Sequence, residues 1–100
     1  MSKKVPVPSW LNITEDGVIV TLRKPIVIDG VTVDKLTMRE PTVRDIRAAS
    51  AIANGDDEVR ELNLLSSLTQ VGQGALDSIG LRNYKRLQEG YFRVVEDDEL

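Results

Sequence analysis

The sequence contains no cysteine and no histidine. Without cysteine there is no disulfide, thiol nucleophile or thiolate metal site, and the absence fits a reducing cytoplasm. Without histidine the chain also lacks the commonest general base and a common metal ligand. The remaining routes to catalysis are carboxylate pairs and serine–lysine arrangements, and no motif of that kind stands out. We therefore expect no enzyme, no cofactor and no metal site.

Long apolar runs are absent as well. No segment approaches the roughly 20 apolar residues of a membrane-spanning helix, and no apolar segment of a signal peptide follows the N-terminal lysines. We expect a protein that stays in the cytoplasm and contacts no membrane. The chain has 100 residues, of which 41% are apolar. That is enough for one domain with a hydrophobic core.

Charge is distributed unevenly along the chain, whose net charge is −3. Residues 1–50 carry eight basic and six acidic side chains, whereas residues 51–100 carry five and ten. This balance disfavours a general nucleic-acid binder, and we expect no nucleic-acid partner, although a local basic face stays open.

A strand turns into a helix between Leu36 and Ala49. Residues 36–39 alternate like a strand, whereas the apolar residues from Val43 onwards have helical spacing. Proline cannot donate to a sheet, so the strand should stop beside Pro41. Thr42 then has the features of a helix N-cap, and the acid three residues later is its reciprocal partner. We expect a structural corner formed by Arg39, Glu40, Pro41, Thr42, Asp45 and Arg47. The four charged residues among them either hold the corner through local ion pairs or bind a partner.

A β-hairpin is expected before this corner. Asp16-Gly17 forms a turn, and residues 18–28 alternate like a strand apart from one proline. Asp29-Gly30 has the composition of a two-residue hairpin turn, in which both central residues need positive φ.

The register of this hairpin poses a problem. A register set by the turn alone would place Lys24 opposite Lys35 and would turn Leu36 away from the face of the preceding valines. We therefore predict a bulge between Val33 and Leu36, across from Pro25.

Helical spacing continues to the end of the chain. We predict helices over residues 43–54, 57–71 and 81–95, with a short helical turn at 75–79. The fold class is α+β: an N-terminal β-hairpin followed by a bundle of about three helices, in the order β-β-α-α-α.

One domain accounts for most of the chain. Residues 1–11 contain two prolines and two lysines and are expected to form a flexible arm, whose Trp10 docks on the domain or waits for a partner. The domain spans residues 12–95, and the acidic residues 96–100 are expected to form a disordered tail.

The last predicted helix has a basic polar face formed by Arg82, Lys85, Arg86 and Arg93. This face is either simply solvated or a patch for an acidic partner, and the sequence leaves both interpretations open.

An ordered set of motifs gives the chain a resemblance to a known family. Met38-Arg39-Glu40-Pro41-Thr42 with Asp45, Arg47, Ala48 and Ala49 closely resembles the tail assembly chaperones of Mu-like and related contractile-tailed phages. The resemblance covers roughly residues 10–92 and includes Lys24-Pro25-Ile26, the leucine-rich helix after residue 57 and Leu81-Arg82-Asn83-Tyr84. The chain departs from the family where it has Gly72 and Gly74 in place of prolines, and Asn83 in place of an acid.

The resemblance implies a protein that is needed to build a phage tail but is absent from the mature virion. Such a protein acts in the cytoplasm of the bacterial host, binds the tape measure protein and keeps it soluble until the tail tube polymerises around it. Further partners implied are the tail tube protein, a frameshift-extended form of the chain itself, and a second copy of the chain.

A chaperone for a long amphipathic helix should offer an apolar groove. We place that groove between the hairpin and the second or third long helix. Its expected contacts are Leu64, Tyr91 and Phe92, with Arg82, Lys85 and Arg86 as the basic partner-binding residues.

Two other functions are open at this point. A hairpin with three helices also describes a winged helix, in which the basic last helix would read DNA. The chain could also be a structural tail component that is retained in the virion.

Overall fold

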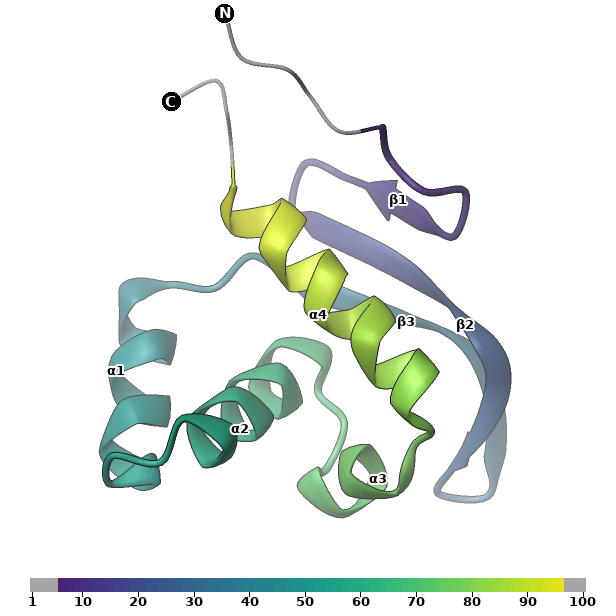
Figure 1. The fold of residues 1–100 in the computed structure, drawn as a ribbon. Helices are drawn as coiled ribbons and strands as arrows, with labels where there is room; N and C mark the ends of the chain where they lie inside the picture. Colours follow the sequence, from purple (N-terminus) through teal and green to yellow (C-terminus); the bar gives the residue numbers. More distant parts are fainter. Residues whose placement is uncertain (1–5, 97–100) are drawn as a thin grey trace, which may run out of the picture.

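The computed structural model describes residues 6–96 as a three-stranded sheet and four helices (Figure 1). Residues 1–5 of the expected arm and 97–100 of the expected tail lie outside the described part. The elements are β1 (Leu11–Ile13), β2 (Gly17–Ile28), β3 (Val31–Arg39), α1 (Val43–Ala53), α2 (Asp57–Thr69), α3 (Gln73–Ser78) and α4 (Leu81–Val95). The sheet is antiparallel in the order β1-β2-β3, and the helices follow it, so the predicted α+β class is confirmed.

Strand β1 is an addition to the predicted hairpin. Leu11 pairs with Val20 and is buried, although the expected arm extended to residue 11. Trp10 packs against the core, as expected for a docked side chain. A three-residue strand has too few positions to show alternation, so only its pairing with β2 reveals it.

The hairpin turn is confirmed. Asp29 and Gly30 both have positive φ, 51° and 80°, and the register beside them is the one that the turn sets: Ile28 pairs with Val31 and Ile26 with Val33. This is the backbone that a type I′ turn requires.

The register changes where the bulge was predicted, but the extra residues lie on β2. Pairing resumes at Thr21 with Lys35, so residues 22–25 of β2 face the single residue Asp34 of β3. The register changes by an odd number of residues, and this returns Leu36 and Met38 to the face that packs on the helices. Both side chains are buried.

The bulge is held by α4. Asn83, 5% exposed, accepts hydrogen bonds from the backbone N–H groups of Arg23 (2.7 Å) and Lys24 (3.4 Å) and donates to the carbonyl of Lys24 (3.0 Å). Its side-chain amide thus replaces the strand partner that these backbone groups lose at the bulge.

The core lies between the sheet and the helices. Helix α4 crosses the sheet in front of β2 (Figure 1). It comes close because Gly90 has no side chain: a Cβ there would lie 3.0 Å from a methyl carbon of Val20. The most deeply buried side chains are Met38, Leu65, Leu68, Leu76, Leu87, Val18 and Val20.

The helix boundaries follow local signals. Thr42 caps α1 in a full capping box with Asp45, and Asn54 ends that helix in the left-handed conformation. Asp56 accepts from two N–H groups at the start of α2. Helix α1 buries alanines at positions 49 and 53, whereas Val43, expected on the same stripe, is exposed at the first turn.

Candidate partner-binding surface

The basic face expected on α4 is only partly available to a partner. Arg86 donates to the carbonyl of Thr21 (2.8 Å), and its guanidinium lies 4.8 Å from the ring centroid of Trp10. Arg93 is ion-paired with Glu89. Two of the four basic residues are therefore engaged within the molecule, and Arg82 and Lys85 are the two that lie exposed.

This arrangement does not support a DNA-reading helix. The helices follow the sheet, whereas the winged-helix expectation places a hairpin after the helices. The side chain of Arg86 fastens α4 to β2, and so it belongs to the structure of the domain and not to a surface patch.

The three apolar residues proposed as contacts have different positions. Leu64 is 4% exposed and belongs to the hydrophobic core, so the expectation of a surface contact at Leu64 is wrong. It lies on the side of α2 that the fold buries. Tyr91 is half-buried against the core, whereas Phe92 is 53% exposed.

Helix α4 exposes three large apolar side chains along one line, an arrangement that was not predicted. Leu81, Phe92 and Val95 are 67%, 53% and 41% exposed. With Lys85 and Gln88 they follow each other at intervals of four, three, four and three residues. This is the spacing at which one helix packs along another. We call these five residues the α4 stripe.

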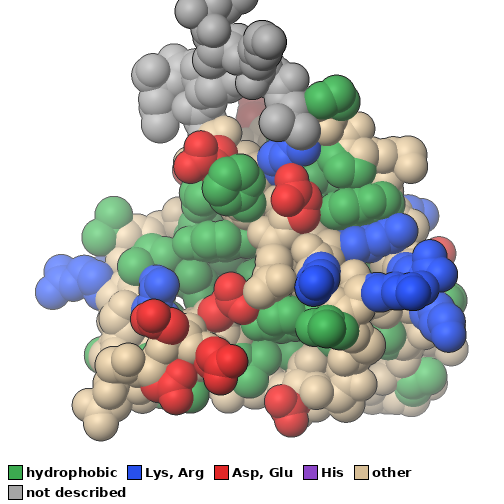
Figure 2. Space-filling view, viewed as in Figure 1, with side chains coloured by type: hydrophobic (Ala, Val, Ile, Leu, Met, Phe, Trp, Pro, Cys, Tyr) green, Lys and Arg blue, Asp and Glu red, His purple; other side chains and the backbone are tan. Residues whose placement is uncertain are grey.

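A cleft of about 530 Å³ adjoins the first half of the α4 stripe. It opens between α2, α3 and α4, and not between the hairpin and the helices as expected. In the lower half of Figure 2, acidic side chains gather over α2 and α3, with hydrophobic side chains between them. The lining residues are Glu58, Glu61, Leu62, Leu76, Asp77, Ile79, Leu81, Tyr84, Lys85 and Gln88.

One carboxylate organises the polar part of the cleft. Glu61 accepts hydrogen bonds from the Tyr84 hydroxyl (2.8 Å) and from the Gln88 amide (2.9 Å). Burial, and then the bond to this carboxylate, raise the pKa of Tyr84 well above its ordinary value. The phenol therefore stays a hydrogen-bond donor at neutral pH. The polar side chains of Glu61, Tyr84 and Gln88 at the cleft are thus hydrogen-bonded to one another.

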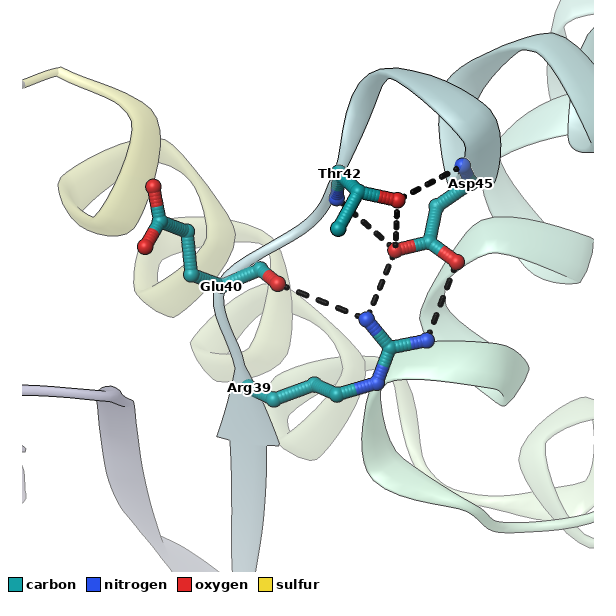
Figure 3. A network of polar contacts seen from close by, with 4 residues as sticks. All are labelled: Arg39, Glu40, Thr42 and Asp45. Atoms are coloured by element: carbon teal, nitrogen blue, oxygen red, sulfur yellow. Dashed lines mark hydrogen bonds and ion pairs between the residues drawn. The ribbon is translucent and has the colours of Figure 1, made fainter.

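The predicted corner between β3 and α1 is confirmed in part (Figure 3). Arg39 binds both oxygens of Asp45, at 2.6 and 3.0 Å, and Asp45 also accepts from the backbone N–H of Thr42 (2.8 Å). The Arg39 guanidinium, then this N–H, hold the pKa of Asp45 far below its usual range. The corner is thus fixed by one bidentate ion pair and a capping box.

Two residues expected in the corner network do not join it through their side chains. The Glu40 carboxylate points away from Arg39 in Figure 3, and only its backbone carbonyl accepts from that residue. Arg47 is exposed, and within residues 6–96 no hydrogen bond or ion pair involves its guanidinium. The backbone N–H of Glu40 instead donates to the carbonyl of Asp16 (2.9 Å), which ties the corner to the first turn.

The acidic run at the start of α2 has a structural role. In the described part of the chain no group of three acidic side chains is placed to hold a metal ion. The run of Asp56, Asp57 and Glu58 is used for helix capping and for the helix dipole. Among residues 6–96, no helix has the length and apolar character needed to cross a membrane.

Comparison with known proteins settles the family. The sequence profile of the family described as phage tail assembly chaperone proteins, E, or 41 or 14, matches residues 19–96, from β2 to the end of α4. No curated protein and no solved structure matches the chain. This family consists of assembly proteins and not of enzymes. On the match over most of its length, the chain belongs to the phage tail assembly chaperones.

Proposed function

We propose that this chaperone binds the tape measure protein and keeps it soluble until the tail tube polymerises around it. The α4 stripe is the observation that carries the proposal. It exposes three large apolar side chains on one line of a single helix, whereas the other large apolar residues exposed among residues 6–96 are distributed over the sheet, α1, α2 and the segment before β1. Exposed apolar residues that lie together often mark an interaction site, whereas single exposed apolar residues are common on any protein surface.

The chemistry of the partner matches this surface. A tape measure protein is a long helix that would expose apolar stripes before the tube covers it. A helix of that kind packs along another helix through residues at three- and four-residue spacing, which is the spacing of the α4 stripe. Each contact would be small, and many copies could cover one tape measure without preventing its later release.

The same proposal places the protein in the cytoplasm of the bacterial host and outside the mature virion. The frameshift-extended form of the chain and the tail tube protein are further partners in this scheme. A chaperone that remained in the virion would instead be a structural component of the tail, and mass spectrometry of purified particles separates the two.

Co-expression with the tape measure protein tests the proposal directly. The tagged chain should co-purify with the tape measure and increase its soluble fraction. Phe92→Asp places a charge on the α4 stripe and should abolish this effect, whereas Val43→Asp places the same charge on the exposed start of α1 and should not. Circular dichroism confirms that both variants are folded.

Two results would contradict the proposal. One is a tape measure that stays insoluble with both the short and the frameshift-extended product. The other is full binding by a folded Phe92→Asp variant, which would place the contact away from α4.

A further inference from the structure

We propose that the α4 stripe and its adjoining cleft bind an amphipathic helix that carries lysine or arginine beside its apolar residues. The inference rests on the proposed function, because it assumes a helical partner. It adds the charge that the partner must have and the residues that recognise it: Glu58 on α2 and Asp77 on α3.

The apolar lining of the cleft meets the α4 stripe at Leu81. Leu81 belongs both to the α4 stripe and to the cleft, and Ile79 and Leu62 extend the apolar lining towards α3 and α2. A helix lying along α4 would place its apolar residues on Leu81 and Phe92. One edge of that helix would face α2 and α3.

This edge meets a negative rim. Glu58, Glu61 and Asp77 line the cleft together with a single base, Lys85, so the net charge of the lining is −2. The Glu61 carboxylate is occupied by Tyr84 and Gln88. Glu58 and Asp77 are exposed, and their carboxylates have no hydrogen-bond or ion-pair partner within residues 6–96.

Charge complementarity therefore favours a basic edge on the partner. The expected acidic partner for α4 finds less support, since Arg86 and Arg93 are engaged within the molecule. Charged groups at the rim of an interface act mainly on partner selection and on the rate of encounter, while the apolar contacts supply affinity.

Two designed helical peptides of equal length test the inference with the full chain. Both carry leucine at three- and four-residue spacing; one has lysine and the other glutamate at the positions flanking the leucines. Like charges on both flanks keep each peptide from pairing with itself. Fluorescence anisotropy measures binding at low and at high salt.

The lysine peptide should bind about tenfold more tightly than the glutamate peptide at low salt, and the difference should shrink at high salt. Glu58→Lys with Asp77→Lys should remove or invert the preference. Glu15→Lys with Asp34→Lys makes the same change in net charge at exposed positions away from the cleft, and it should leave the preference intact.

Equal binding of the two peptides, or equal loss of preference in both double variants, would overturn the inference. Failure of both peptides to bind would also overturn it. The same holds if both fail because a second copy of the chain occupies α4, which sedimentation velocity would detect as a dimer. If the peptides are discriminated but the tape measure is not captured, the surface assignment stands and the proposed function fails. If the tape measure is captured equally by the Glu58→Lys, Asp77→Lys variant, only this inference fails.

Discussion

Replacing Asn83 by alanine should strongly destabilise the domain, although this residue lies far from the hydrophobic centre of the core. The side chain makes two short hydrogen bonds to the bulge of β2, at 2.7 and 3.0 Å, and a third at 3.4 Å. Alanine would remove the protein partner of the N–H of Arg23 and of the carbonyl of Lys24 at a part-buried site.

The expected loss follows from the number of bonds. Each of these part-buried hydrogen bonds contributes about 1 kcal/mol. We therefore expect Asn83→Ala to lower the free energy of unfolding by about 2–3 kcal/mol. For a domain of this size that corresponds to a fall of about 10–20 °C in melting temperature.

Asn83→Asp distinguishes the hydrogen bonds that this side chain accepts from the one that it donates. A carboxylate can accept from both N–H groups but cannot donate to the Lys24 carbonyl, and its second oxygen would repel that carbonyl oxygen. The loss should therefore be about 1–2 kcal/mol.

Urea unfolding followed by circular dichroism measures these differences. Arg82→Ala, at the adjacent exposed position, is the control and should change the free energy of unfolding by less than about 0.5 kcal/mol. The reasoning is refuted if Asn83→Ala is as stable as this control, because the bulge would then not depend on α4.

Three further changes test other parts of the fold. Asp45→Asn should lower the free energy of unfolding by about 1 kcal/mol at pH 7, since it weakens the pair with Arg39 and the helix cap. Folding depresses the pKa of Asp45, so this contribution is present at neutral pH and should disappear as the pH falls below about 4, the ordinary pKa of aspartate. Acid unfolding of the variant and of the wild type measures the difference in stability at each pH. Gly17→Ala should cost about 3 kcal/mol or more in thermal unfolding, because the new Cβ would lie 2.0 Å from a backbone oxygen of β3; a normal melting temperature would contradict this. Arg86→Ala should cost about 1–2 kcal/mol and shift the fluorescence of Trp10 to longer wavelength, whereas unchanged fluorescence would show that the ring contact is absent in solution.

The elements of this fold that depend on neighbouring residues could be predicted well. The cap of α1 needs only Thr42 and Asp45, three residues apart, and the hairpin turn needs only Asp29 and Gly30. Helix α4 begins and ends at the predicted residues. Each of these features depends mainly on residues that are a few positions apart in the sequence, and such residues are necessarily close in space.

The surface proposed for partner binding could be predicted only in part. Phe92 was correctly placed on the surface, whereas Leu64, another apolar residue at helical spacing, is in the core. Helical spacing shows which residues share one face of a helix. It does not show which face packs on the sheet when several helices can pack there. The acidic rim required α2 and α3 to be brought beside α4, which no local pattern describes.

The sequence by itself therefore determined the α+β class, the turns, the caps, most helix boundaries and the family. The tertiary structure alone decided that β1 joins the sheet and that the extra residues of the bulge lie on β2. It also decided that Asn83 holds the bulge, and Arg86 the neighbouring Thr21, from about 60 residues away in sequence. The physical reason is the same in each case. Backbone groups without a local partner must find one somewhere, and only the packed arrangement of α4 on the sheet specifies which side chain supplies it.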